Sequence, residues 1–204
     1  MESQVETRVV LLRHAETSAP DRFHGSESDV GLGERGHEQA RAMAGHLASL
    51  APGALASSAM RRAIETLSPA AGECGLVPER IGALHERRMG PLSGATRDEG
   101  WAIYESTMAR WMAGDLGYTH DGGESYTQIR DRALPAFLGL AERHAGGTVV
   151  VVCHGVVIRV LLTSLLPEVP VEGFDRVGID FMALNDLRSV GGRWRAECLN
   201  RIVA

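Results

Sequence analysis

Two histidines stand at the ends of aliphatic runs, and their placement is the first sign of chemistry in this chain. His14 closes the stretch VVLLRH, residues 9–14, and His154 closes the stretch VVVVCH, residues 149–154. Continuous apolar runs of this length are typical of strands that are buried on both faces of a parallel sheet. Ligands of open α/β sheets bind beyond the carboxyl ends of the strands. If the two strands are parallel neighbours, both imidazoles converge at that edge.

Arginines accompany the histidines at the same edge. Arg13 directly precedes His14, and Arg61-Arg62 fall in the first turn of a helix that follows a short strand expected at 54–57. A cation at a helix N-terminus opposes the macrodipole, so stability alone does not favour it there, whereas a bound anion would compensate. Because a planar guanidinium pairs two oxygens at once, these residues predict a phosphate site.

Imidazoles beside a phosphate suggest covalent phosphoryl transfer. A neutral imidazole can attack phosphorus in line when its second nitrogen holds the proton, usually against a backbone carbonyl or a carboxylate. The transition state requires positive groups around the equatorial oxygens. The departing alkoxide requires one acid that supplies a proton.

The surrounding sequence predicts the elements that position these groups. Helices are expected at residues 33–50, 59–71 (ending at Gly72), 94–118 (with breaks at Gly100 and Gly114), 125–144 (bent near Pro135) and 156–166. Further strands are expected at 78–81 and 148–152, and as edge strands joined near Gly191-Gly192 at 178–184 and 193–199. This alternation favours an α/β fold, a three-layer α/β/α sandwich with a mostly parallel central sheet. Residues 1–204 contain no linker and are expected to form a single domain.

Composition narrows the classes of function. With 204 residues, of which 44% are hydrophobic, the chain can build one sizeable core. Its net charge of -5 argues against nucleic acid or an anionic membrane as a partner, and no apolar run is long enough for a transmembrane helix. All 21 basic residues are arginine, which excludes a Schiff-base lysine and a Walker-type phosphate loop. The polar N-terminus and three cysteines without paired spacing indicate a cytoplasmic protein.

A series of short segments carries a resemblance to one family. In chain order they are RHAET at 13–17, RFHG at 22–25, GHEQA at 36–40, SSAMRRAIET at 57–66, HERRMGPLSG at 85–94, GGES at 122–125 and CHGVVIR at 153–159. These segments resemble the ordered motifs of the histidine phosphatase superfamily, the family of phosphoglycerate mutase and related phosphatases. The resemblance extends from about residue 8 to 162 and implies a phosphoglycerate mutase-like fold.

The resemblance also implies a role for each matching residue. His14 is the expected nucleophile and forms a phosphohistidine. Arg13, Arg62 and His154 are expected to hold the phosphoryl oxygens. Glu86 takes the place of the acid that protonates the leaving group and then assists the attack of water. Neither a metal nor an organic cofactor is implied.

Further substrate contacts follow from the resemblance alone. They are Thr17, Arg22, His24, Gly25, Arg87 and Gly155. For Arg87 the sequence supports a position in the pocket and a position in solvent equally. Residues 94–123 are expected to form a helical insertion that covers the substrate. Specificity is expected to lie there and in the loop after Thr17.

Three functions remain open at this point. The first is a metal-independent phosphomonoesterase that hydrolyses a small phosphorylated metabolite, and the second is a phosphoglycerate mutase-type phosphotransferase. Met89 stands where mutases have tyrosine, and residues 94–123 contain only Arg97 and Arg110 where mutases carry further basic residues, which favours the phosphatase. The third is a catalytically silent phospholigand-binding protein, which would not need the acid Glu86. The identity of the ester stays open, and so does the oligomeric state, for which the strands after Pro170 make a homodimer conceivable.

Overall fold

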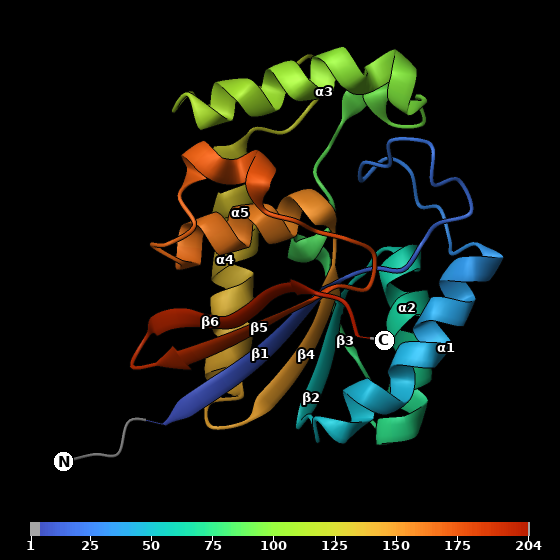
Figure 1. Ribbon diagram of the computed structural model, residues 1–204, viewed down its shortest axis with the longest axis vertical. Coiled ribbons are helices and arrows are strands. Elements are labelled where there is room, and N and C mark those ends of the chain that lie inside the picture. Colours follow the sequence, from blue (N-terminus) through green and yellow to red (C-terminus); the bar gives the residue numbers. More distant parts are fainter. Residues whose placement is uncertain (1–4, 204) are drawn as a thin grey trace.

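The computed structural model describes residues 5–203, in which a six-stranded sheet is flanked by helices (Figure 1). The strand order is β3-β2-β4-β1-β5-β6, with the bounds β1 (Glu6–Arg13), β2 (Ala54–Ser58), β3 (Glu79–Ile81), β4 (Thr148–Cys153), β5 (Leu184–Val190) and β6 (Arg193–Arg201). The first four strands in this order are parallel, and β5 and β6 form an antiparallel hairpin. β1 pairs with β4 so that Arg13 lies opposite Cys153. His14 and His154 therefore follow at the same level of the sheet.

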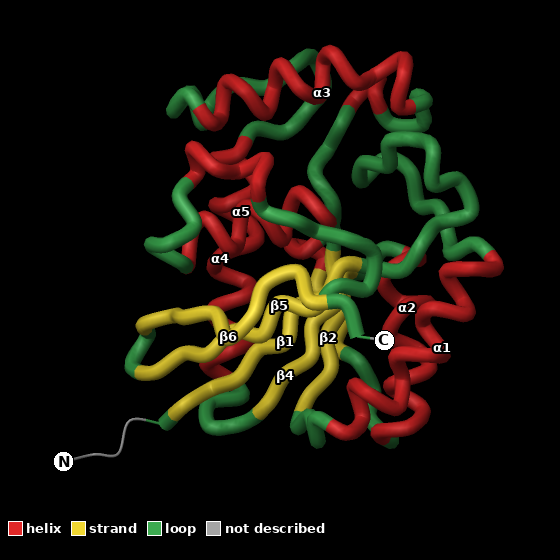
Figure 2. The backbone as a smooth tube through the Cα atoms, viewed as in Figure 1, coloured by secondary structure: helices red, strands yellow, loops and turns green. Residues whose placement is uncertain are grey.

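Helices cover both faces of this sheet (Figure 2). One face packs against α1 (Glu34–Ser49) and α2 (Arg61–Cys74), and the other against α4 (Tyr126–Arg143) and α5 (Gly155–Leu165). The remaining helix, α3 (Arg97–Met112), lies across the end of the molecule to which the parallel strands point (Figure 1). The α/β fold class is therefore confirmed. Among the described residues, no helix combines the length and apolar character needed to span a membrane.

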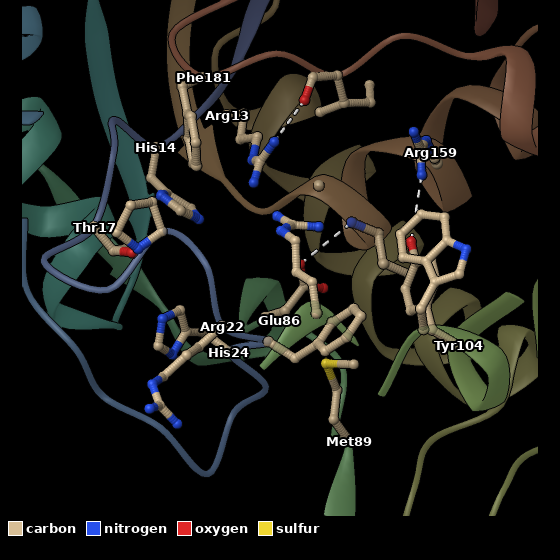
Figure 3. A pocket seen from close by; sticks show the side chains of 17 residues that line it. Arg13, His14, Thr17, Arg22, His24, Glu86, Met89, Tyr104, Arg159 and Phe181 are labelled. Carbon is tan, nitrogen blue, oxygen red and sulfur yellow. Dashed lines mark hydrogen bonds between the residues drawn. The ribbon is translucent and has the colours of Figure 1, made fainter. Parts of the chain in front are cut away.

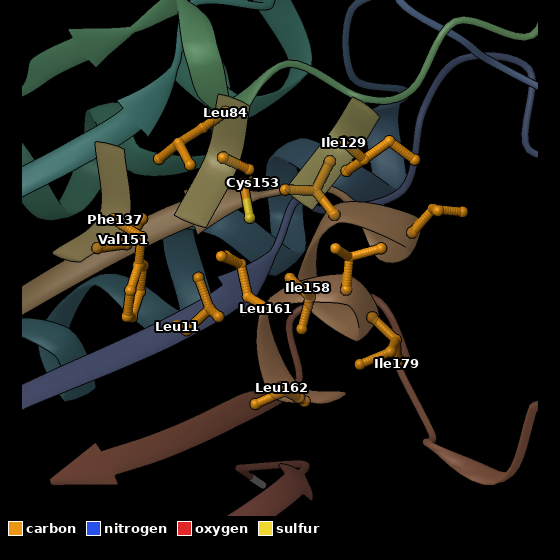
Figure 4. Packing of buried hydrophobic residues seen from close by; sticks show 14 of the residues in the cluster. Leu11, Leu84, Ile129, Phe137, Val151, Cys153, Ile158, Leu161, Leu162 and Ile179 are labelled. Atoms are coloured by element: carbon orange, nitrogen blue, oxygen red, sulfur yellow. The ribbon is translucent and has the colours of Figure 1, made fainter. Parts of the chain in front are cut away.

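Alternate residues of β1 face two different cores. Val9 and Leu11 pack toward α4 and α5, whereas Val10 and Leu12 pack toward α1 and α2. Figure 4 shows Leu11 and Val151 in the first of these cores. Each fully buried aliphatic side chain contributes roughly 1.5–3 kcal/mol. The sheet therefore anchors β1 and β4 from both sides and fixes the residues at their tips.

Two helices differ from the sequence expectation. α2 does not end at Gly72 but continues to Cys74, and Gly75 closes it with φ +64°. A glycine inside a helix is tolerated, whereas the left-handed residue after a helix strongly favours one. Gly100 does not break the next helix but lies inside α3, where an added Cβ would come within 2.8 Å of the Phe23 ring. Close packing, not helix termination, explains this glycine.

The segment before the last hairpin also differs from expectation. Residues 178–184 were expected to form an edge strand, but only Leu184 belongs to β5. β5 pairs with both β1 and β6, so it is an interior strand. The preceding residues form a loop because their polar backbone groups bond elsewhere. The Met182 N–H, for example, donates to the Arg13 carbonyl at 3.2 Å.

Candidate active site

A cavity of about 220 Å³ opens beside the carboxyl end of β1, underneath α3 (Figure 3). Its walls come from the tip of β1, the loop after Thr17, α3, the start of α5 and the loop before β5. Most of the side chains expected from the sequence meet here. Those that line the cavity are Arg13, His14, Thr17, Arg22, His24, Glu86 and Gly155.

His14 has the geometry of a nucleophile. Its Nδ1 lies 2.8 Å from the Ala15 carbonyl oxygen. Because a carbonyl only accepts, Nδ1 carries the proton and Nε2 keeps its lone pair. Burial, reinforced by the charges of Arg62 and Arg13, holds the pKa of His14 well below its usual range. The imidazole is therefore neutral at neutral pH.

Arg13 is held in place from two sides. One terminal nitrogen donates to the Ile179 carbonyl at 2.8 Å, and the guanidinium carbon lies 3.9 Å from the centroid of the Phe181 ring. Burial lowers the pKa of Arg13 to about 10, so the side chain stays charged at neutral pH. Within the described part of the chain its Nε is buried and has no hydrogen-bond partner. That donor is available to an anion.

Arg62 and His154 lie beside His14 but do not form the cavity wall. The rings of His14 and His154 are 5.2 Å apart between centroids. Arg62 Nε donates to His154 Nδ1 at 3.2 Å, and its NH1 donates to the Ser28 carbonyl. Since Nδ1 of His154 accepts, its Nε2–H donates to Ser58 Oγ at 2.8 Å. Both side chains are fully buried next to His14, and their direct contact with a phosphoryl oxygen stays a prediction.

Glu86 presents its carboxyl group to the same cavity (Figure 3). One carboxyl oxygen accepts from the backbone N–H of Arg87 at 2.8 Å, and the other from the N–H of Val156 at 3.3 Å. Val156 lies in the first turn of α5, so the helix fixes the carboxyl group relative to β4. The side chain is 8% exposed. Glu86 is therefore a fixed, nearly buried carboxyl group on the wall that also carries His14.

Two of the expected substrate contacts lie behind the wall. The Arg87 guanidinium is buried beneath α3, with its carbon 5.2 Å from the Tyr104 ring centroid and 5.4 Å from that of Trp111. Gly25 faces the chain itself, since an added Cβ would come within 3.0 Å of the Met89 Cβ. Gly25 therefore allows the loop after Thr17 to approach the segment that carries Glu86.

Several cavity residues were not singled out as ligands from the sequence. One face of α3 contributes Arg97, Trp101 and Tyr104 to the cavity. Their spacing of four and three residues is typical of one helix face, so the sequence could have predicted that they act together. Arg159 donates to the Val177 carbonyl at 2.9 Å, and it also lines the cavity. Phe181 carried no local signal because only the tertiary structure brings its loop to Arg13.

The charge of the cavity differs from that of the whole chain. Its wall carries the guanidinium groups of Arg13, Arg22, Arg97 and Arg159 together with the carboxyl group of Glu86. The chain as a whole has a net charge of -5. A concave site of one sign inside low-dielectric walls concentrates ligands of the opposite sign. The site is therefore built for an anion.

Other reactive groups have ordinary structural explanations. Cys153, next to His154, is fully buried in the core, and burial raises the pKa of its thiol. It packs as a small apolar residue. Within residues 5–203, no group of three or more His, Cys, Asp or Glu side chains is arranged to hold a metal ion.

Comparison with known proteins identifies the family. The model of the histidine phosphatase superfamily (branch 1) matches residues 9–202. The chain belongs to this superfamily. It is 33% identical to the metal-independent phosphoserine phosphatase of Arabidopsis thaliana over 95% of this chain and 83% of that protein. It is 34% identical to the glucosyl-3-phosphoglycerate phosphatase of Mycolicibacterium vanbaalenii over 84% of this chain and 79% of that protein.

Solved structures agree with this assignment. The native mycobacterial glucosyl-3-phosphoglycerate phosphatase superposes with a TM-score of 0.82 at 29% identity, covering 97% of this chain and 100% of that one. The phosphoglycerate mutase-like fold inferred from the motif order is thereby confirmed for this histidine phosphatase.

Proposed function

We propose that this histidine phosphatase hydrolyses a small phosphorylated metabolite through a phosphohistidine on His14, without a metal ion. The observation that carries the proposal is the state of His14. The Ala15 carbonyl fixes its proton on Nδ1, burial keeps the ring neutral, and the ring stands in a cavity rich in guanidinium groups. This combination presents a lone pair on Nε2 to a bound phosphate ester.

Unused donors on the cavity wall support a seat for the phosphoryl group. Arg13 Nε and Thr17 Oγ1 are both buried without a hydrogen-bond partner in the described part of the chain, and both residues line the cavity. Buried polar groups are normally satisfied, so a ligand oxygen is the natural partner for them. The start of α5 at Gly155 adds the positive end of a helix to the same wall.

The first half-reaction transfers the phosphoryl group to the enzyme. Nε2 of His14 attacks phosphorus in line, the N–P bond forms, and the bond from phosphorus to the ester oxygen breaks. Glu86, in its acid form, gives its proton to the departing oxygen, so that an alcohol leaves. Arg13 stabilises the charge on the equatorial oxygens.

The second half-reaction returns the enzyme to its starting state. The Glu86 carboxylate now takes a proton from water as the water oxygen attacks phosphorus. The N–P bond breaks, inorganic phosphate leaves, and Nε2 of His14 regains its lone pair. Glu86 ends in its acid form, ready for the next ester.

The outer part of the cavity supports a leaving group that carries its own negative charge. Arg97 and Arg159 line this part together with the rings of Trp101 and Tyr104, and the α3 segment, residues 94–123, acts as the cover over the substrate. The names of two relatives contain those of their esters, phosphoserine and glucosyl-3-phosphoglycerate. Each of these esters combines a phosphate group with a carboxylate. We extend that substrate class, a phosphate ester with a second anionic group, to this chain.

The three free cysteines further support a cytoplasmic enzyme.

The test is phosphate release from a panel of esters with EDTA present, for the wild type and for His14→Ala. We expect release that resists EDTA in the wild type and falls to background in the variant. Quenching during turnover with alkaline detergent should trap a phosphoenzyme that is stable to alkali and labile to acid, as a phosphoramidate is. Isomerisation of phosphoglycerate without net release would instead establish the mutase. Binding of esters without turnover would establish a phospholigand-binding protein.

A further inference from the structure

The loop of residues 177–183 holds Arg13 at three points. The Ile179 carbonyl accepts from the guanidinium at 2.8 Å, the Phe181 ring lies against its face at 3.9 Å, and the Met182 N–H donates to the Arg13 carbonyl. The same Phe181 ring lies 5.7 Å from the ring of His14 between centroids. The loop therefore contacts both the expected nucleophile and the cation next to it.

This loop does not hold its own shape by regular secondary structure. Met182 adopts φ +62°, a conformation that few residues other than glycine adopt without cost. Such a backbone persists only where surrounding contacts determine it. A turn closed by the bond from the Ala183 N–H to the Asp180 carbonyl surrounds Met182, and further contacts tie the loop to the hairpin of β5 and β6.

Asn200, in β6, provides those contacts. Its Oδ1 accepts from the Asp180 N–H at 2.7 Å, and its Nδ2 donates to the Asp180 carboxylate at 2.8 Å. Its own N–H donates to Asn185 Oδ1 at 3.0 Å, and Nδ2 of Asn185 donates to the Leu11 carbonyl of β1 at 3.1 Å. Asn200 itself has φ +50°, which asparagine tolerates better than most residues. A continuous chain of hydrogen bonds thus joins β6 to β1 around the loop.

We propose that Asn200 is a positioning residue for Arg13, acting through Asp180 and the loop that carries Ile179 and Phe181. Asn200 does not line the cavity, so it acts through Arg13 and touches no substrate. The bonds to Asp180 hold the loop so that the Ile179 carbonyl and the Phe181 ring keep the guanidinium beside His14. This inference rests on the proposed function only in that Arg13 binds the phosphoryl group.

The experiment measures binding of inorganic phosphate and of vanadate by calorimetry, beside turnover of several esters. The test variant is Asn200→Asp, which keeps the side-chain shape but opposes two carboxylates at Asp180. We expect phosphate affinity to fall between about tenfold and hundredfold, since small displacements of binding groups cost this much. Because Arg13 contacts the phosphoryl group and not the leaving group, kcat/KM should fall by the same factor for every ester.

Rescue by exchange makes the test specific. Combining Asn200→Asp with Asp180→Asn restores the bond between the two side chains with donor and acceptor exchanged, while the bond from the backbone N–H of residue 180 is kept, and it should recover phosphate affinity. In an Arg13→Gln background, Asn200→Asp should have little further effect, because the group that it positions is gone. Arg193→Ala, an exposed change on the same strand, should leave affinity unchanged.

Several outcomes would overturn the proposal. One is a folded Asn200→Asp variant that binds phosphate as tightly as the wild type. Another is a double variant, Asn200→Asp with Asp180→Asn, that recovers no phosphate affinity. A third is an effect of Asn200→Asp that is just as large in the Arg13→Gln background. If Asn200→Asp does not fold, Asn200→Gly permits the same φ without the amide, and it is judged by its phosphate affinity and by its effect in the Arg13→Gln background. A wild type that binds phosphate but turns over no ester would refute the proposed phosphatase function. The positioning role of Asn200 could then still be tested by phosphate affinity. A wild type that neither binds phosphate nor turns over esters would refute both proposals.

Discussion

The inner and outer ends of the cavity are built from different parts of the fold. At the inner end, Arg13 and His14 follow β1, whose residues Leu11 and Leu12 are completely buried, one on each face of the sheet. At the outer end, Arg97 is exposed and Trp101 is 47% exposed, both on a helix that lies outside the three layers. The difference shows that the sheet fixes the position of the chemistry, whereas the exposed side chains at the start of α3 can change to suit a leaving group. The other end of α3 belongs to the core through Met108 and Trp111.

The largest expected effect distinguishes chemistry from binding at the inner end. Glu86→Gln removes the proton donor but keeps a group of the same shape. For alkyl phosphates we expect a loss of roughly 10²–10⁴-fold in kcat/KM, which reports on the transfer of the phosphoryl group to His14. p-Nitrophenyl phosphate should lose far less because its phenolate leaves without a proton. Equal losses on both substrates would contradict the assignment of Glu86, and the exposed Glu38→Gln serves as the matched control.

A smaller effect is expected at the outer end, on discrimination and not on chemistry. Phosphoserine and phosphoethanolamine differ only by a carboxylate, so the ratio of their kcat/KM values isolates recognition of the second anion. Arg159→Gln should lower this ratio by about tenfold, the value of a hydrogen bond to a charged group. Arg97→Gln should lower it less, because exposed charge pairs are worth about 1 kcal/mol or less.

Arg110→Gln is the control for these two variants. It lies near the far end of α3, pairs with Asp115, and should not change the ratio. A ratio near one in the wild type would show that the outer arginines do not read a second negative charge. Phosphate release from p-nitrophenyl phosphate should be nearly the same in all three variants, which checks that the inner end is intact.

The smallest expected effect is the change in the free energy of unfolding with pH. The pKa values of His14, His24, His85 and His154 are all lowered in the folded state, with burial as the largest cause. An unfolded histidine titrates near pKa 6.5, so below that pH the unfolded chain binds more protons than the folded one. The free energy of unfolding should therefore fall as the pH drops from about 7.5 to about 5.5, above the range in which carboxylates titrate.

Denaturant unfolding at the two pH values measures this dependence. His14→Gln should show a smaller fall than the wild type because one buried imidazole no longer has to be protonated on unfolding. His144→Gln, a change at a half-buried position at the end of α4, is the control variant. A wild type whose stability is the same at both pH values would contradict the neutral, buried state of His14.

The sequence by itself determined the fold class and most of the inner end of the site. The aliphatic runs before His14 and His154 predict two buried parallel strands, because only such strands need apolar side chains on both faces. The ordered motifs indicated the family. Local signals of this kind are sufficient where a residue's position follows from the strand or helix that carries it.

Only the tertiary structure decided which residues complete the site. It buries Arg87 beneath α3, places Arg62 and His154 beside His14 but outside the cavity wall, and brings Phe181 against Arg13. The expected strand at 178–184 is a loop because its backbone groups bond to Arg13 and to Asn200. Arg13 lies far before the loop in the sequence, and Asn200 lies after it. Contacts between segments far apart in the chain leave no periodic pattern in the sequence, so no local reading could have found them.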